Sequence, residues 1–231
     1  MTSASSLQDL NKTIQNKYVQ KIVENITKSK STSLEPLKCL EVLLKLHPGT
    51  CGISKNAIEA FCKGNVDSKS ECLVEKSGKC LHLIQQTRGG GVSGGVYKKC
   101  WSEYQTQLIG TLEGLFSQLF KNVENVSVET PKSEKFKIND LKLSPEPITK
   151  FGQLMTRFGN ICSFLEIALL EPFPVPKSVK VNRLVNFVER GLNIDQAILN
   201  RKANTDNIVL GTLLPKIHQN LLGILKALIF L

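Results

Sequence analysis

The sequence predicts an all-α protein. The first observation behind this prediction is a pair of apolar stripes at helical spacing, over 101–120 and 151–169. The second is that the other helical patterns are joined by short connections and keep no heptad register. The third is that no segment of comparable length has the character of a strand. Since such stripes can be buried only against one another, an α-solenoid of HEAT- or armadillo-like helix pairs is favoured over a compact bundle.

The two stripes consist of side chains three or four positions apart, which lie on one face of a helix. The first stripe contains Trp101, Tyr104, Leu108, Leu112, Leu115, Phe116 and Leu119. The second contains Phe151, Leu154, Met155, Phe158, Ile161, Cys162, Leu165 and Leu169. Both are expected to form the core.

Four further helices are predicted before residue 88. The first is expected to bury Leu7, Leu10, Ile14, Tyr18, Ile22 and Ile26, and to end in the polar stretch 28–33. Ser33 is predicted to cap the second helix, which His47-Pro48-Gly49 ends. A short third helix is bounded by Ser54 and Gly64, and a fourth covers about 70–86.

Residues 125–147 interrupt the helical pattern with several prolines and charged residues. They are predicted to form a flexible linker between an N-terminal helical part, 1–124, and a C-terminal part, 148–231, of the same solenoid. After the second stripe, three prolines over 172–176 predict an extended turn. Ser178 is expected to cap the next helix, which Gly191 ends. The last helix begins near Asp206, with Pro215 as a kink or as the start of a second helix.

The net charge of +10 is high for a chain of ordinary globular composition. It favours an acidic partner, of which nucleic acid is the commonest. No run of five or more Lys and Arg residues marks a focused site. A surface that contacts RNA and a generally basic surface without that role therefore both remain open.

No catalytic, metal or cofactor constellation stands out in the sequence. The seven cysteines include no Cys-x-x-Cys pair, and His47, His82 and His218 do not have zinc-ligand spacing to a cysteine pair. Most cysteines fall on predicted apolar faces, as Cys72 and Cys80 do, and are expected to be buried free thiols. Because no nucleophile–base arrangement is apparent either, we expect a protein that is not an enzyme and binds no metal or cofactor.

The N-terminus lacks the basic segment and apolar stretch of a signal peptide. The longest C-terminal apolar run, 221–231, is too short to span a bilayer and contains Lys226. A soluble protein of a reducing compartment, with no membrane partner, is therefore expected. Since the chain stops within an apolar pattern and without a helix cap, it is also expected to be part of a longer protein.

One glycine-rich segment, Gly89-x-Gly91-x-x-Gly94-x-Val96, has the spelling of a kinase glycine loop. The other kinase motifs are absent, and the preceding segment is helical rather than a strand. Val96 stands where a P-loop has its lysine. Residues 88–95 are therefore predicted to be a flexible loop between helices and not a phosphate site.

Two segments have the spacing Leu-x-x-Leu-Leu. On an exposed helix such leucines can enter a hydrophobic groove of a partner. The same leucines belong to the predicted core stripes, so core packing is the favoured interpretation. The candidate partner-docking residues are Leu40, Leu43, Leu44, Leu210, Leu213 and Leu214.

Several segments, taken in order, resemble the middle, HEAT-like region of the PELP/RIX family of proline-, glutamate- and leucine-rich proteins. The resemblance covers residues 35–231 and lies in the order of helices and of the turns between them. Its points are 37–40, His47-Pro48-Gly-Thr-Cys51-Gly52, the 101–116 helix after the glycine loop, Arg157-Phe158 to Leu165, Phe173-Pro-Val-Pro176, and Leu213-Leu-Pro-Lys-Ile-His218. The family's larger N-terminal helical region and its acidic, proline-rich tail are mostly missing here.

This resemblance implies a scaffold of the nucleus, nucleolus and nucleoplasm that takes part in maturation of the large ribosomal subunit and in rRNA processing. The partners it implies are HEAT-repeat and WD-repeat subunits, a midasin-type ATPase and a SUMO protease. In such a complex the basic surface is expected either to contact nearby rRNA or only to tolerate it. The family is also described as a coregulator of nuclear receptors that binds through Leu-x-x-Leu-Leu helices, which is the alternative function.

Overall fold

The computed structural model describes residues 3–29, 33–87, 94–121, 123, 136–202 and 204–231. Its elements are all helices, and no strand occurs within these ranges, which confirms the all-α prediction. The helices are α1 (Ser3–Lys28), α2 (Leu34–Leu46), α3 (Pro48–Ile53), α4 (Lys55–Lys63), α5 (Glu71–Ile84), α6 (Gly95–Leu119), α7 (Pro147–Leu170), α8 (Val181–Leu192), α9 (Gln196–Asn200) and α10 (Thr205–Ile229).

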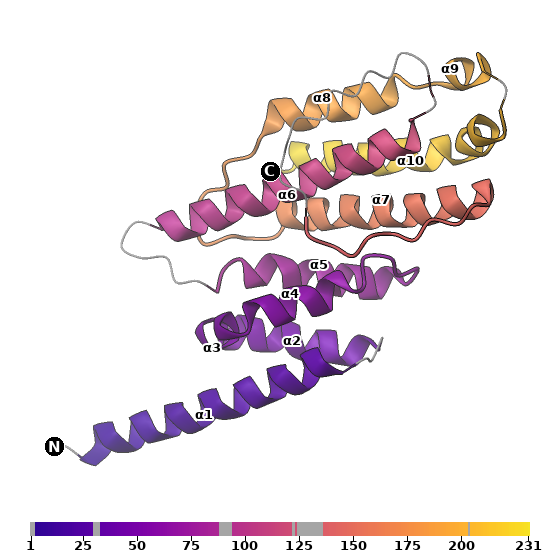
Figure 1. Ribbon diagram of the computed structural model, residues 1–231. Coiled ribbons are helices and arrows are strands. Elements are labelled where there is room, and N and C mark those ends of the chain that lie inside the picture. The colour runs from indigo at the N-terminus through magenta and orange to yellow at the C-terminus, as the bar shows by residue number, and fades with distance from the viewer. Residues whose placement is uncertain (1–2, 30–32, 88–93, 122, 124–135, 203) are drawn as a thin grey trace.

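The helices are arranged in layers, from α1 at one end of the molecule to α8 at the other (Figure 1). The helix α1 packs on α2, α3 and α4, and both α2 and α4 pack on α5. The helix α5 packs in turn on α7, which α6 and α10 also cover, and α8 and α9 pack on α10. The central helix α7 therefore connects the N-terminal layers to the C-terminal ones.

The core is built around α6 and α7, as the two long stripes predict. Every residue of both stripes is buried. The largest fully buried side chains include Trp101, Phe116, Phe158 and Phe164, all on these two helices. The contact between α5 and α7 is close because Gly78 has no side chain. A Cβ at Gly78 would lie 2.7 Å from Cδ1 of Ile167.

The N-terminal helix α1 buries a different face from the predicted one. Ile14, Tyr18 and Ile22 are 44, 66 and 40% exposed, whereas Val19 and Val23 are buried. The prediction of the buried stripe was wrong here because α1 carries apolar residues on two faces, and only one of them meets α3 and α4. Side chains before residue 12, including Leu7 and Leu10, lie outside the described ones.

The segment before α7 is tied to the fold along its described part. Residues 124–135 of the predicted linker lie outside the described residues, but Phe136 is buried against the ring of Tyr104. The backbone N–H of Phe136 donates a 2.8 Å hydrogen bond to Oγ1 of Thr111. Arg157 of α7 donates to the backbone oxygen of Asn139 at 2.9 Å. From Phe136 onwards the segment is therefore extended chain packed on α6 and α7, not a free linker.

The buried Arg157 also binds the loop between α4 and α5. Its Nε donates to Oδ1 of Asp67 at 2.7 Å and its Nη2 to Oδ2 at 2.5 Å. The side chain of Arg157 is 6% exposed and that of Asp67 is 42% exposed, so the guanidinium is shielded from water and the carboxylate only in part. The bidentate geometry is of the strong, charge-assisted kind. One side chain of α7 thus holds two segments, at Asp67 and at Asn139, that lie far apart in the sequence before α7.

The proline-rich segment 171–180 is extended, as predicted, and is fixed to α6 and α7. The indole Nε1 of Trp101 donates to the backbone oxygen of Ser178 at 3.0 Å. Nζ of Lys177 donates to the oxygens of Ala168 and Leu169 at the end of α7. Burial lowers the pKa of the Lys177 ammonium. The position before α8 is Lys180, so the expectation that Ser178 caps this helix was wrong.

The last helix, α10, continues through Pro215 without a second start. It is capped by Asn204, whose side chain accepts from the backbone N–H of Asn207. By length and composition it is apolar enough to cross a membrane. One of its faces packs on α7 and α8, where Leu210, Ile217 and Leu221 are buried. Two short helices, α3 and α9, were missed by the sequence patterns.

Glu59 of α4 accepts a hydrogen bond from Gln85 at the end of α5, and we predict that its ionisation makes the stability of the protein depend on pH. Burial alone would raise the pKa of its carboxyl, but Lys63 and Lys55 lower it, with a hydrogen bond from Gln85, and the net pKa lies below its ordinary value. A carboxyl with a lowered folded-state pKa adds stability above its unfolded pKa of 4.5, and that stability is lost as the pH falls through the folded pKa.

We therefore expect Glu59→Gln to be less stable than the parent at neutral pH, and this deficit to shrink as the pH falls below about 4.5. Urea unfolding at a series of pH values measures it. Glu24→Gln is the matched control, since its Glu24–Lys28 pair is exposed. A Glu59→Gln deficit that is the same at acid and neutral pH would contradict the assignment.

Candidate protein-binding site

The six predicted docking leucines lie mainly in the core. Leu40 and Leu44 of α2 are 0 and 2% exposed, and Leu210 and Leu214 of α10 are 1 and 6% exposed. Leu43 and Leu213 are half-buried and pack against the same core. Because a groove on a partner can receive only exposed leucines, neither motif is presented for docking in this fold.

Most of the glycine-rich segment, 88–93, lies outside the described residues. Gly94 follows it and has a positive φ of 63°, a left-handed conformation that glycine adopts at little cost. It directly precedes α6 as the residue before the first helical turn.

The histidines and cysteines contribute to packing. Nε2 of His82 lies 2.9 Å from the oxygen of Pro172, and the ring packs edge-on against Phe173. Burial lowers the pKa of His82. Nε2 of His218 lies 3.0 Å from the oxygen of Ile194. No group of three or more metal-ligating side chains occurs within the described ranges.

All seven cysteines are free thiols, as predicted. Five are buried, but Cys39 and Cys72 are exposed, so the expectation that Cys72 lies on the buried face of its helix was wrong. The buried stripe of α5 runs through Val74, Gly78 and Leu81 instead. Burial raises the pKa of Cys51 to about 11. A thiol with so high a pKa is a poor nucleophile at neutral pH.

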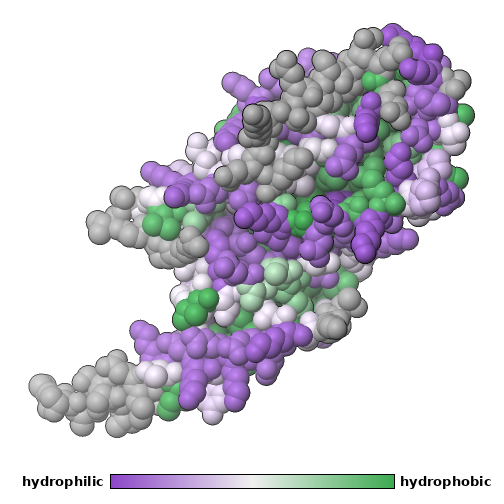
Figure 2. All heavy atoms as spheres, in the orientation of Figure 1, coloured by the Kyte–Doolittle hydropathy of each residue, from purple (hydrophilic) through white to green (hydrophobic). Residues whose placement is uncertain are grey.

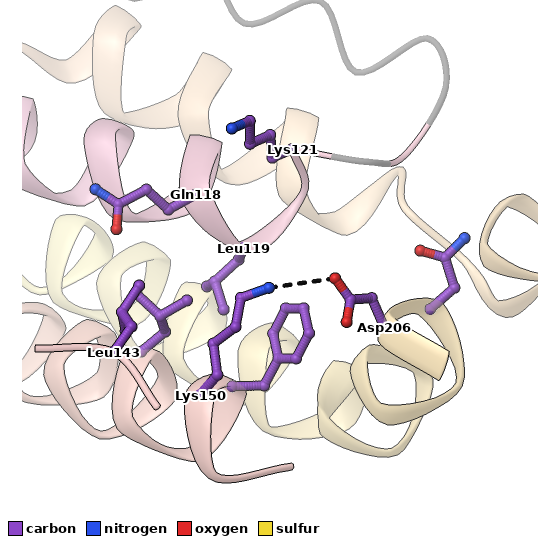
Figure 3. A pocket seen from close by; sticks show the side chains of 9 residues that line it. Gln118, Leu119, Lys121, Leu143, Lys150 and Asp206 are labelled. Atoms are coloured by element: carbon purple, nitrogen blue, oxygen red, sulfur yellow. Dashed lines mark hydrogen bonds and ion pairs between the residues drawn. The ribbon is translucent and has the colours of Figure 1, made fainter. Parts of the chain in front are cut away.

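A small pocket lies where the end of α6 meets the starts of α7 and α10 (Figure 3). Apolar side chains, among them Leu119, Phe151 and Leu154, form its floor. At its rim Nζ of Lys150 lies 3.2 Å from Oδ2 of Asp206. The enclosed volume is about 240 Å³, below the roughly 300–1,000 Å³ typical of small-molecule sites. Lys150 and Asp206 are thus paired with each other, and Lys121 is the remaining charged residue of the lining. The small volume argues against a small-molecule site here.

Exposed apolar side chains are present on both outermost layers. At one end α1 exposes Ile14, Tyr18 and Ile22, four residues apart; we call these the α1 stripe. At the other end α8 exposes Val181 and Val185, also four residues apart. Contiguous apolar side chains on a surface mark places where another protein can pack. The α1 stripe is the stronger candidate because it is longer and includes an exposed tyrosine, a residue enriched at interfaces.

The helix α1 carries charge as well as the α1 stripe. On the face of the molecule in Figure 2, hydrophilic side chains cover much of the described part of α1, whereas green, hydrophobic side chains reach the surface near α7 and α10. Lys12, Lys17 and Lys21 are exposed along α1. The sequence patterns missed the α1 stripe as a surface. The signal was present as a second apolar face, at Val19 and Val23, on the same helix.

Comparison with known proteins finds relatives over most of the chain. The chain is 22% identical over 235 residues to proline-, glutamic acid- and leucine-rich protein 1 of Xenopus laevis, which covers 99% of this chain and 22% of the relative. It is 26% identical over 196 residues to the protein of the same name from Mus musculus, which covers 84% of this chain and 17% of the relative. No family model matches. The resemblance predicted from the sequence is thus confirmed, and the chain spans about a fifth of the length of these curated relatives.

Proposed function

We propose, from its homology to the proline-, glutamic acid- and leucine-rich proteins, that this chain is a non-enzymatic scaffold subunit in biogenesis of the large ribosomal subunit. Its role would be in pre-ribosome maturation and rRNA processing, in the nucleus, nucleolus and nucleoplasm. The observation that carries the proposal is the alignment of nearly the whole chain with a relative of that name. The role in ribosome assembly is inferred from the family that the sequence resembles.

The proposed architecture is an α-solenoid of HEAT- or armadillo-like helix pairs. The layered order of the helices supports it, since each layer packs mainly on the next and α7 lies between the two halves (Figure 1). Solenoids present extended faces to other proteins. Exposed apolar side chains on such a face mark a place where a partner can pack. The α1 stripe has that character.

The proposed partners are HEAT-repeat and WD-repeat subunits, a midasin-type ATPase and a SUMO protease. The α1 stripe is the surface that we propose for a protein subunit. The net charge of +10 and the exposed Lys12, Lys17 and Lys21 support additional contact with rRNA. Phosphate contacts of this kind raise affinity without selecting a sequence.

The test is affinity purification of the tagged chain from nuclear extract, with and without RNase. We expect the WD-repeat and HEAT-repeat subunits in both samples, because the proposed contacts are between proteins. Their recovery only without RNase would make RNA the primary partner. Recovery of neither would contradict the proposed assembly.

A variant of the α1 stripe makes this test sharper. Tyr18→Glu places one negative charge on the stripe, at a side chain 66% exposed, and is expected to change the free energy of unfolding by less than about 0.5 kcal/mol. It is expected to reduce recovery of the protein subunits. Lys17→Gln is the matched control, since it changes the net charge equally at the neighbouring exposed position. Equal recovery with the two variants would remove the α1 stripe as the docking surface.

The alternative function is that of a nuclear-receptor coregulator that binds through its Leu-x-x-Leu-Leu helices. It is supported by the spelling of the two motifs. It requires Leu40, Leu44, Leu210 and Leu214 to leave the core in which they are packed. The first proposal needs no such rearrangement, and we therefore favour it.

A further inference from the structure

A groove lies beside α7, between α5 and α10. Residues of all three helices line it, among them Val74 of α5, Ser163, Glu166 and Ile167 of α7, and Lys216 and Asn220 of α10. Small residues, Gly159 and Ser163, leave room along α7, and the aliphatic Ile167 and Leu170 follow them. The groove is therefore partly apolar, with polar groups along both walls.

Glu166 is a half-buried carboxylate in this groove that forms no ion pair within the described residues, although Lys226 lies near enough to act on its pKa. Within the described residues no hydrogen bond or ion pair of its side chain is present. Its carboxylate lies against Gly223 of α10, where a Cβ would collide with Oε1 of Glu166. Burial raises the pKa of Glu166, and Lys226 offsets this only in part. Shielding an unpaired carboxylate from water destabilises the fold, and a cation that pairs with the carboxylate offsets this cost.

Other shielded carboxylates of this protein show the usual arrangement. Glu41 pairs with Lys45 and Lys76, both at 2.7 Å. Glu113 pairs with Arg183 at 2.6 Å. Glu166 differs from them because its partner is missing within the described part of the chain.

A second polar group in the groove is also unsatisfied. Nδ2 of Asn220 is buried and has no hydrogen-bond partner in the described structure. Asn220 lies beside Gly159, at 3.1 Å from the position of a Cβ there. The same groove therefore holds two unpaired groups. One is the carboxylate of Glu166 on α7, which lies against Gly223, and the other is the amide donor of Asn220, about one turn before Gly223 on α10.

We propose that this groove binds a segment of a partner protein that carries an Arg or Lys side chain. The cationic group pairs with Glu166, and a backbone oxygen of the segment accepts from Nδ2 of Asn220. Glu71, Glu75 and Glu171 also line the groove, together with Lys216. Nζ of Lys79 lies 2.8 Å from Glu75 and 3.7 Å from Glu171, so Glu71 and Glu166 are the carboxylates of the lining without an ion pair in the described part of the chain. This charge favours a basic peptide over a nucleic acid, although the protein as a whole is basic.

The test is an NMR titration of the 231-residue chain with the peptide acetyl-Ala-Leu-Arg-Leu-Ala-amide. We expect shifts of the backbone amides of Gly159, Ser163 and Gly223. The peptide with Gln in place of Arg is expected to bind about tenfold or more weaker, as is the Arg peptide with Glu166→Gln, since a charged hydrogen bond is lost in each case. Glu35→Gln, on the exposed part of α2, is the matched control and is expected to leave the titration unchanged.

Several results would overturn the proposal. One is the absence of shifts at these amides up to about 10 mM peptide. Another is equal binding of the Arg and Gln peptides, or of the parent and Glu166→Gln. Shifts of the same amides by hexauridylate, without the peptide effect, would assign the groove to nucleic acid instead. Thermal unfolding separates binding from folding, because Glu166→Gln removes an unpaired, half-buried charge and is expected to keep or raise the melting temperature.

This test is independent of the ribosome-assembly proposal. It uses the isolated chain and a defined peptide, so it can succeed where co-purification of assembly factors fails, and the reverse. If both succeed, cross-linking at Ser163 within the purified complex would locate the natural segment.

Discussion

Replacing Leu40 and Leu44 together by alanine is expected to lower the free energy of unfolding by about 4–10 kcal/mol, from about 2–5 kcal/mol for each fully buried leucine. Both side chains are at most 2% exposed. Since most domains are stable by only about 5–15 kcal/mol, the double variant is expected to be largely unfolded. Circular dichroism with urea unfolding measures this.

The matched control is Leu46→Ala, on the same helix at a side chain 68% exposed. Its effect is expected to stay within about 0.5 kcal/mol. A coregulator that docks through Leu40 and Leu44 would give the opposite pattern for the double variant, with normal stability and lost partner binding. That outcome would overturn the buried placement of this motif and revive the alternative function.

Replacing Trp101 by alanine is expected to cost about 3–5 kcal/mol of stability. Trp101 is 1% exposed and joins three parts of the structure. Its ring lies next to Phe173, its Nε1 binds the oxygen of Ser178, and Nζ of Lys177 lies 5.3 Å from its ring centre. Loss of the ring therefore releases the extended segment 171–180 from α6 as well as leaving a cavity.

Trp101→Phe separates packing from the hydrogen bond. It keeps an aromatic ring but leaves the Ser178 oxygen without its donor, and is expected to cost about 1–3 kcal/mol. Thermal unfolding followed by circular dichroism suits both variants, because Trp101 is the one tryptophan of the chain. If the two variants were equally unstable, the hydrogen bond and not the packing would dominate.

Helix positions were predictable where the signals were local. Ser54 and Gly64 flank α4 as expected, and the stripes of α6 and α7 are buried in full. The short α3 was missed because Pro48, which ends α2, also occupies the first turn of the next helix, a position where proline is favourable. The helix α9 has only five residues, too few for an apolar period to show.

Surface and groove features were harder to predict than helices. The α1 stripe and the Val19–Val23 face are equally apolar at helical spacing, so periodicity could not choose between them. Glu166 and Asn220 are more than fifty positions apart in sequence. No pattern indicates that they line one groove, or that the basic partner of Glu166 is missing, because both facts depend on how α7 and α10 pack.

The sequence by itself determined the all-helical class, the extent of the long helices and most of their ends, together with the resemblance to a known family. Periodicity, caps and prolines act over one or two turns, so they can be read without neighbours. Only the tertiary structure decided which faces are buried, that the leucine motifs lie in the core, and which polar groups remain unpaired. Burial and pairing are properties of contacts between distant segments, and the sequence does not list those contacts.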